Sequence, residues 1–424
     1  ACYGHPVART PNFDRLAAEG VLFEQCHVQH PVCAPSRCST MTGLYPHVSG
    51  HRTLWHLLRP HEPNLLRYAK EGGWHVRIHG KNDLLAAESA KLWCDYAGST
   101  GGKGPGPNPF KPDEAGFYSF LYSPMEATAD EVADAQRLRT ALEFLRSSPP
   151  EPFLLFITLS WPHPPYSAPH DYHEMYDPGD LPPLRPAGLA GKPSFHELIR
   201  KYRRLNEAPD ELFRKVQAVY LGMVSFVDML LGELMATLDE TGLASRTALF
   251  AFSDHGDWAG DYGLVEKWPS ALDDTITRIP LVARLPGGAE GHVVAEPVEL
   301  MDLTPTVMAL AGLELAHTQF GRSLAAQLHG APGDPKRAVY AEGGYDPHEP
   351  YCFEGKRVEP ISRSAEHIYY PKGLQQQEVP LSVCRATMIR TLDYKLIRRG
   401  FDAGELYDLR KDPQELHNVY DQPD

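Results

Sequence analysis

The sequence predicts an α/β protein with a mostly parallel central sheet, flanked by helices on both faces, and a smaller C-terminal antiparallel-sheet subdomain. Two patterns support this prediction. Short apolar runs alternate with amphipathic helical runs as far as about residue 335, which is typical of a parallel sheet with crossover helices. After a stretch containing Gly and Pro at 330–336, the pattern changes to short strands. We therefore expect an α/β domain at 1–335 and a small α+β subdomain at 336–424.

The individual elements follow from the spacing of apolar residues. Continuous apolar runs of strand length predict buried strands at 75–78, 153–159, 247–252 and 280–284. Helical spacing predicts helices at 12–20, 64–72, 128–147 and 211–238, the last ending before Gly242. In the C-terminal part we expect strands at 338–342, 382–388 and 394–398, then a closing turn or short helix at 412–418. Two segments rich in Gly and Pro predict surface loops that shape a site, at 98–112 and 162–193.

Composition and charge exclude several classes of protein. Hydrophobic residues make up 42% and charged residues 23%, an ordinary globular balance. The formal net charge of −14 gives no global attraction for nucleic acid or for an anionic membrane, so an anionic ligand needs a local cluster of cations. We see no apolar run long enough to span a membrane and expect no such span. The 7 cysteines are too scattered for a disulfide framework, and the N-terminal residues show no secretory signal, so no compartment is predicted.

One motif indicates the chemistry. Residues 33–37 read CAPSR and are followed by Thr42-Gly43. This resembles the signature of the type I sulfatases, which belong to the alkaline phosphatase-like superfamily. Weaker similarities to the family occur elsewhere in the chain, in the same order as in the family, at 10–20, 224–228, 303–306, 321–324 and 405–418. The resemblance implies that a maturation enzyme oxidises Cys33 to formylglycine, whose hydrate attacks the sulfur of a sulfate ester, and that Arg37 supports the nucleophile and the sulfate. The alternative for Cys33 is an inert buried thiol.

The resemblance also implies a divalent metal, calcium in most of the family. Asp254 and His255 follow the predicted strand 247–252, and the family's metal ligands stand at this position, together with the modified Cys33. The alternative is a solvated turn. In the family, the first strand ends in two further adjacent acidic or amide ligands, and residues 1–10 contain no such pair. We expect the chain to be part of a longer protein from which the first central strand is missing; the alternative is a natural loss of half the metal site.

Three further positions match the family's sulfate-binding residues. Lys81 follows the strand 75–78, and His163 lies in a PHPP loop after the strand 153–159. Lys267 closes the segment GLVEK. The resemblance implies that Lys81 contacts the sulfate, that His163 binds it and moves a proton, and that Lys267 holds a sulfate oxygen and helps to protonate the leaving alkoxide. Asp83 stands where the family has His, so either Asp83 replaces it or another His takes the task; the candidates are His47 and His51.

The resemblance thus implies a sulfuric ester hydrolase acting on a sulfated small molecule or sugar. We expect seven residues to meet in one pocket: Cys33, Arg37, Lys81, His163, Asp254, His255 and Lys267. Two alternatives remain open. One is a phosphonate or phosphodiester hydrolase of the same superfamily, and the other is a catalytically silent protein that binds a sulfated glycan.

Overall fold

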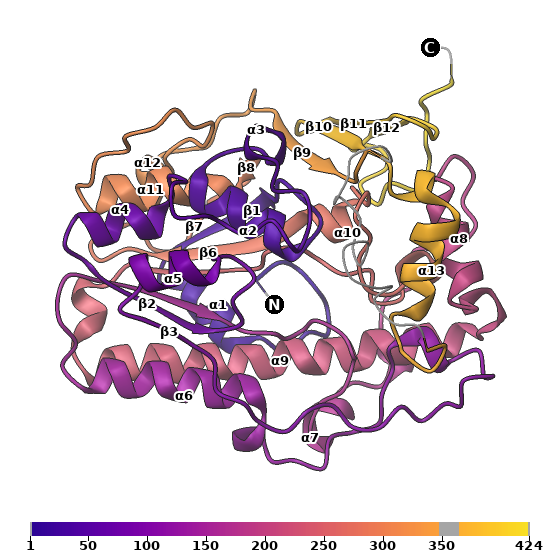
Figure 1. Ribbon diagram of the computed structural model, residues 1–424, viewed down its shortest axis with the longest axis horizontal. Coiled ribbons are helices and arrows are strands. Elements are labelled where there is room, and N and C mark those ends of the chain that lie inside the picture. Colours follow the sequence, from indigo (N-terminus) through magenta and orange to yellow (C-terminus); the bar gives the residue numbers. More distant parts are fainter. Residues whose placement is uncertain (1, 347–363, 423–424) are drawn as a thin grey trace.

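A computed structural model describes residues 2–346 and 364–422 of the chain (Figure 1). Its helices are α1 Pro11–Ala18, α2 Cys33–Thr42, α3 Pro46–Ser49, α4 Leu65–Glu71, α5 Ala87–Trp93, α6 Ala133–Arg146, α7 His170–His173, α8 Phe195–Tyr202, α9 Asp210–Glu240, α10 Asp274–Thr277, α11 Leu303–Leu310, α12 Ala325–Leu328 and α13 Tyr370–Glu378. The strands of the larger part are β1 Val21–His27, β2 His75–Gly80, β3 Tyr96–Gly98, β4 Phe153–Thr158, β5 Leu249–Phe252, β6 Arg278–Arg284, β7 His292–Val294 and β8 Val298–Glu299.

These strands form two sheets. The first has the order β5-β6-β1-β7, with β8 also paired to β1, and the second has the order β3-β2-β4. The second sheet is entirely parallel, whereas β6 runs antiparallel to both β1 and β5. The predicted α/β class is confirmed, with a mixed sheet in the larger part. The strands β4 and β5 are less buried than their apolar sequences predict, because among the described residues each pairs on one side only.

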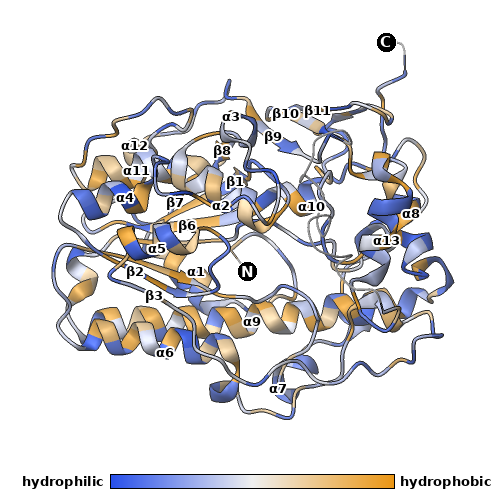
Figure 2. Cartoon of the chain, in the orientation of Figure 1, coloured by the Kyte–Doolittle hydropathy of each residue, from blue (hydrophilic) through white to orange (hydrophobic). Residues whose placement is uncertain are grey.

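Helices cover both faces of the sheets. On one face, Leu16 of α1 and Leu231 of α9 pack with Leu22 of β1 and Val282 of β6. On the other face, α2, α4 and α11 pack against the apolar side of β2. Figure 1 shows α6 and α9 side by side below the sheets and α4, α11 and α12 above them. In Figure 2 the apolar residues, drawn in orange, concentrate in the strands and on the helices that cover them, as an α/β fold requires.

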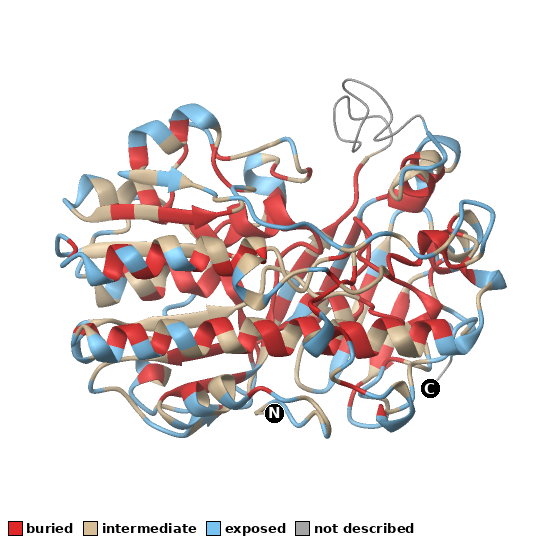
Figure 3. Cartoon of the chain, turned by 90° about the horizontal axis from the view of Figure 1, so that it is seen from below, coloured by how far each residue is buried: buried red, intermediate tan, exposed pale blue. Residues whose placement is uncertain are grey.

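The longest helix, α9, differs from expectation in one respect. Its 31 residues are long and apolar enough to cross a membrane, by length and composition only, although we expected no such segment. The helix is apolar because it belongs to the core: 56% of its most apolar 18-residue segment is buried within the protein. Buried residues recur along much of this helix (Figure 3), and they include Val216, Val219, Met223 and Phe226. Buried core helices often have this length and composition, so these two properties are weak evidence for a membrane span.

The C-terminal part contains an antiparallel sheet with the order β12-β11-β10-β9, formed by β9 Val339–Gly343, β10 Ala386–Arg390, β11 Tyr394–Arg399 and β12 Glu405–Asp408. The helix α13 packs against α8 of the larger part, and both lie beside the small sheet in Figure 1. The predicted strand 382–388 begins too early, because Pro380–Val383 form a 3-10 turn. The strand β12 was not predicted, and the predicted closing segment 412–418 consists of turns and irregular chain. The domain boundary at 335/336 stays a prediction.

Candidate active site

Cys33 and Arg37 lie on one face of α2. Cys33 is the first residue of this helix, so its side chain lies at the helix N-terminus. Arg37 follows four residues later, and side chains at this spacing share a helix face. The Cys33 Sγ atom lies 3.1 Å from Nε2 of His255. The Arg37 guanidinium donates from Nε to Oδ2 of Asp254 at 2.7 Å and from Nη1 to the carbonyl oxygen of Lys81 at 3.0 Å. The helix therefore joins two other loops of the site.

Asp254 and His255 lie in the loop that leaves β5. His255 donates from Nδ1 to the carbonyl oxygen of Gly256 at 2.8 Å, which leaves Nε2 facing Cys33. A side chain at Gly256 would place Cβ only 2.0 Å from the carbonyl oxygen of Thr275, so only glycine fits there. Burial alone would raise the pKa of the Asp254 carboxyl, but Arg37 and His255 outweigh burial and lower it. Asp254 is therefore a carboxylate at neutral pH.

Lys81 is positioned by the close approach of β2 and β4. Gly80 has φ +117°, and a Cβ atom there would lie 1.9 Å from the carbonyl oxygen of Thr158, so glycine is required immediately before Lys81. The Lys81 Nζ atom lies 2.8 Å from Oδ2 of Asp83. Asp83 therefore faces a cation, which balances the negative charge of its carboxylate.

The two alternative histidines lie elsewhere. His47 is exposed and pairs with Glu342 of β9. His51 is buried, and its Nε2 atom lies 2.7 Å from Oε1 of Glu62. Neither lines the cavity formed by the predicted residues. The structure thus offers neither of them as a direct replacement for a histidine at position 83.

His163 and Lys267 form a hydrogen-bonded pair. His163 donates from Nδ1 to the carbonyl oxygen of Pro164 at 2.7 Å, so Nε2 can accept a hydrogen bond from Lys267 Nζ, also at 2.7 Å. Burial, reinforced by the charges of Lys267 and Lys81, lowers the pKa of His163 well below its usual value. Burial would lower the pKa of Lys267, but Cys33 and Glu266 outweigh burial and raise it. The pair is therefore a neutral imidazole beside an ammonium group.

The predicted residues converge on one small cavity of about 60 Å³. Six of them line it: Cys33, Arg37, Lys81, His163, Asp254 and His255. The seventh, Lys267, reaches it through its hydrogen bond to His163. Further residues line the cavity without having been predicted as site residues, among them Ser160, Trp161, Tyr220 and Asp257. The proximity of Asp257 to His255 in the sequence was an available signal. Tyr220 gave none, because it occurs within the apolar pattern of α9.

Three of the converging residues carry donor atoms for a metal ion: Cys33, Asp254 and His255. Donor atoms of Cys33, Asp254 and His255 lie within 4.8 Å of one another, a spacing that allows them to share a cation. The imidazole of His255, the carboxylate of Asp254 and the side chain of Cys33 suit a divalent ion that accepts nitrogen, oxygen and sulfur ligands. Calcium takes about six to eight oxygen ligands, more than these three residues offer. The set therefore fits a divalent cation, whereas calcium itself stays a prediction.

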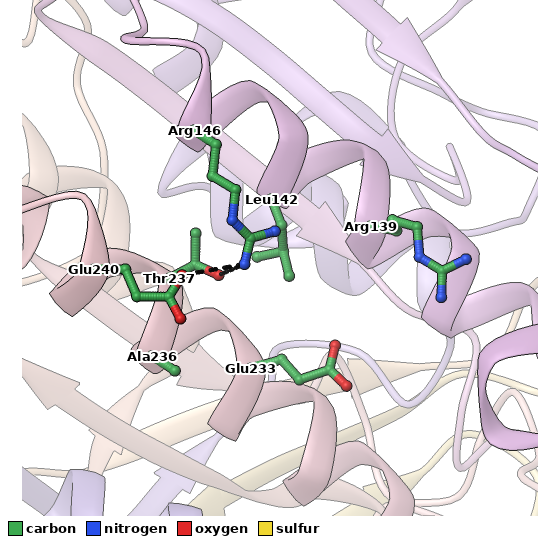
Figure 4. Close-up of a pocket in the computed structure, with 7 residues that line it drawn as sticks. All are labelled: Arg139, Leu142, Arg146, Glu233, Ala236, Thr237 and Glu240. Carbon is green, nitrogen blue, oxygen red and sulfur yellow. Dashed lines mark hydrogen bonds and ion pairs between the residues drawn. The ribbon is translucent and has the colours of Figure 1, made fainter.

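A second cavity, of about 230 Å³, lies between α6 and α9 (Figure 4). Arg146 donates there from Nη2 to Oγ1 of Thr237 at 3.0 Å and to Oε2 of Glu240 at 3.3 Å. Charged side chains dominate its lining, which consists of Arg139, Leu142, Arg146, Glu233, Ala236, Thr237 and Glu240. Among the residues that the structure describes, this lining contains no cysteine, serine or histidine. The cavity around Cys33 is therefore the candidate active site.

The fold and the site together define a class of protein. A phosphonate monoester hydrolase of Agrobacterium radiobacter superposes with a TM-score of 0.76 at 22% identity, covering 98% of this chain and 87% of that one. The structure of the protein BT4656 in complex with its substrate D-glucosamine-2-N,6-O-disulfate superposes with a TM-score of 0.73 at 19% identity. The match covers 99% of this chain and 90% of that one. At these identities the likeness shows a shared fold alone.

The sequence comparisons identify the family. The family model described as Sulfatase matches residues 1–313, and that of the N-sulphoglucosamine sulphohydrolase C-terminal region matches residues 348–424. A sulfatase of Escherichia coli K12, YidJ, is 29% identical, covering 99% of this chain and 80% of that protein. The iduronate 2-sulfatase of Mus musculus is 25% identical, covering 99% and 88%. The chain belongs to the sulfatase family and is a sulfuric ester hydrolase.

Proposed function

We propose that this protein cleaves sulfate monoesters with formylglycine derived from Cys33 as its nucleophile. The observation that carries the proposal is the convergence of Cys33, at the start of α2, with three cationic side chains and a neutral histidine around one cavity. Formylglycine supplies an aldehyde whose hydrate offers the attacking oxygen. A maturation enzyme that oxidises Cys33 is therefore a required partner.

In this proposal the other residues bind charge and move protons. Arg37 and Lys81 hold oxygens of the sulfate, because both present cations at the cavity wall. Lys267 carries a proton at neutral pH and donates it toward the leaving alkoxide, while the neutral His163 accepts or returns a proton at Nε2. Asp254 and His255, with the modified Cys33, would hold a divalent cation, which supplies positive charge beside the sulfate.

The proposed substrate is a sulfated small molecule or sugar. Two similarities support a sugar: one relative is an iduronate 2-sulfatase, and one structural neighbour is bound to a glucosamine disulfate. A second candidate activity is phosphonate or phosphodiester hydrolysis, favoured by the structural neighbour from Agrobacterium radiobacter. Turnover of an aryl sulfate relative to the matching aryl phosphonate distinguishes the two activities.

The test compares Cys33→Ser with Cys38→Ser, both produced together with a formylglycine-generating enzyme. Mass spectrometry of the parent protein should show an aldehyde in place of the thiol at Cys33. Cys33→Ser should lose activity by orders of magnitude, because a sulfated serine cannot release sulfate by the hemiacetal route, and each tenfold loss corresponds to about 1.4 kcal/mol of barrier. Cys38, which is buried outside the cavity, is the matched control.

Two results would contradict the proposal. Multiple turnovers by Cys33→Ser near the parent rate, with an inactive Cys38→Ser, would mean that the wrong nucleophile has been chosen. An unmodified thiol at Cys33 after production with the maturation enzyme would instead favour the silent, glycan-binding alternative.

A further inference from the structure

Glu266, the residue before Lys267, lies at the centre of a buried group of cations. Its side chain is almost fully enclosed. Oε2 accepts a hydrogen bond from Nη2 of Arg203 at 2.5 Å, and Oε1 accepts one from Nζ of Lys372 at 3.1 Å. The same Oε1 lies 4.0 Å from Nζ of Lys267. One carboxylate thus faces three cations, of which Lys267 also donates to His163.

The backbone of Glu266 is equally constrained. Its φ is +66°, in the left-handed region that non-glycine residues adopt at a cost of roughly 1–3 kcal/mol. Its N–H donates to the hydroxyl of Tyr166 at 2.9 Å, and its carbonyl accepts from the N–H of Trp258 at 3.2 Å. The Tyr166 hydroxyl in turn donates to Oδ1 of Asp257, which lines the cavity. Such a conformation persists only where its surroundings determine it, and here they do so from both sides.

The two side chains that donate hydrogen bonds to the Glu266 carboxylate come from separate parts of the chain. Arg203 directly follows α8, whereas Lys372 belongs to α13 in the C-terminal part. Burial would raise the pKa of Glu266, but Lys372 and Arg203 outweigh burial and lower it, so the carboxylate stays charged. Because a buried charge is stable only when it is paired, Lys372 of α13 adds to the stabilisation that Arg203 gives this carboxylate.

We propose that Glu266, held by Arg203 and Lys372, is a positioning residue that fixes the ammonium group of Lys267 against His163. Helix α13 thereby takes part in aligning the proton donor for the leaving group. This inference rests on the role proposed above for Lys267. According to this inference, Lys372, more than 100 residues further along the chain, affects catalysis without contacting the substrate, through its hydrogen bond to Glu266.

The experiment uses leaving groups of different basicity. A proton donor matters most when the departing alkoxide is basic, as in an alkyl sulfate, and least when it is stable, as in a nitrophenyl sulfate. Misplacing Lys267 should therefore slow alkyl sulfate hydrolysis more than nitrophenyl sulfate hydrolysis. A general loss of structure lowers both rates together.

Glu266→Gln and Lys372→Gln are measured beside Lys267→Ala in the matured holoenzyme. We expect kcat for the alkyl sulfate to fall at least about tenfold more than kcat for the nitrophenyl sulfate in Glu266→Gln, with a smaller change of the same kind in Lys372→Gln. In a Lys267→Ala background, Glu266→Gln should cause no further selective loss. Glu378→Gln, which removes an exposed carboxylate from the same helix α13, is the control and should leave both rates unchanged.

Equal losses for the two substrates, or a selective loss that persists without Lys267, would overturn the inference. If Glu266→Gln does not fold, Lys372→Gln decides, since Arg203 still pairs with Glu266 in that variant. If Lys267→Ala shows no leaving-group selectivity, the proposed role of Lys267 fails. If Lys267→Ala loses alkyl sulfate hydrolysis selectively but Glu266→Gln and Lys372→Gln do not, the positioning role of Glu266 is rejected, while the proposed role of Lys267 stands.

Discussion

Cys33 lies at a point of the protein that stabilises negative charge. It begins α2, where helix N–H groups favour an anion. Burial would raise the pKa of its thiol, but Lys267 and His255 lower the pKa to about 7. Cys26, by contrast, is buried in the core, and burial raises its pKa well above the usual value. The 6 cysteines that the structure describes are all free thiols, and Cys352 lies outside the described residues.

This difference predicts how the unmodified protein reacts. In protein made without the maturation enzyme and kept in chelator, alkylation of Cys33 by iodoacetamide should rise with a midpoint near pH 7, because the thiolate is the reactive form. Peptide mass spectrometry measures the rate at each pH. Lys267→Ala should move the midpoint upward, since it removes a cation that stabilises the thiolate, and Cys26 should stay unreactive. A midpoint for Cys33 at the ordinary thiol value of about 8.5 would contradict the assignment.

At the scale of elements, the loop that follows β4 carries His163 to the site, and the helix α6 anchors this loop. Asp134 of α6 holds the loop after β4. Its Oδ2 atom accepts hydrogen bonds from the backbone N–H groups of Ser160 and Trp161, both at 2.8 Å. His163 follows two residues later. A helix of the outer layer thus fixes where this loop leaves the sheet.

Asp134→Ala should therefore affect both stability and catalysis. Loss of the carboxylate leaves two backbone donors without their partner, which costs about 2 kcal/mol of unfolding free energy. The freed loop should also lower kcat by about tenfold or more, because His163 and the Lys267 that bonds to it lose their alignment. Urea unfolding and steady-state kinetics measure the two effects. Asp130→Ala, at an exposed carboxylate near the same helix, should change neither, and an Asp134→Ala enzyme with parent kcat would show that the loop needs no anchor.

At the scale of the whole molecule, buried ion pairs join the small sheet to the larger part. Lys395 of β11 is fully buried and donates from Nζ to Asp274 of α10 at 3.0 Å and to Glu415 at 2.6 Å. Arg390 of β10 also donates to Asp274, at 3.3 Å. Such charges depend on one another, because an unpaired charge in the interior is strongly destabilising.

Lys395→Met should consequently lower the unfolding free energy by about 3–5 kcal/mol, since the variant leaves two buried carboxylates short of a cation. Urea unfolding measures the loss. Lys411→Met is the matched control, because Lys411 is exposed and its pair with Asp408 lies at the surface, where a pair contributes at most about 1 kcal/mol. A loss in Lys395→Met no larger than that of the control would mean that the buried cluster does not couple the two parts.

Much of this architecture could be predicted from local patterns. Helical spacing in 211–238 predicted α9 to within a few residues, because many of its apolar positions face the core. The short strand β12 was not predicted, because its sequence, ELYD, has too few apolar residues to indicate a strand without its neighbour β11. The partial exposure of β4 and β5 escaped as well, because pairing partners are not encoded in a strand's own residues.

The sequence by itself determined the family, the identity of the nucleophile candidate and the charged residues around it, because these depend on residue types in a fixed order. The tertiary structure alone decided which groups meet. It brought Tyr220 to the cavity and directed His47 and His51 to other partners. It also joined Glu266 to Lys372 across the fold. Contacts between residues far apart in the chain arise only when packing brings their elements together, and no local pattern of residues records that packing.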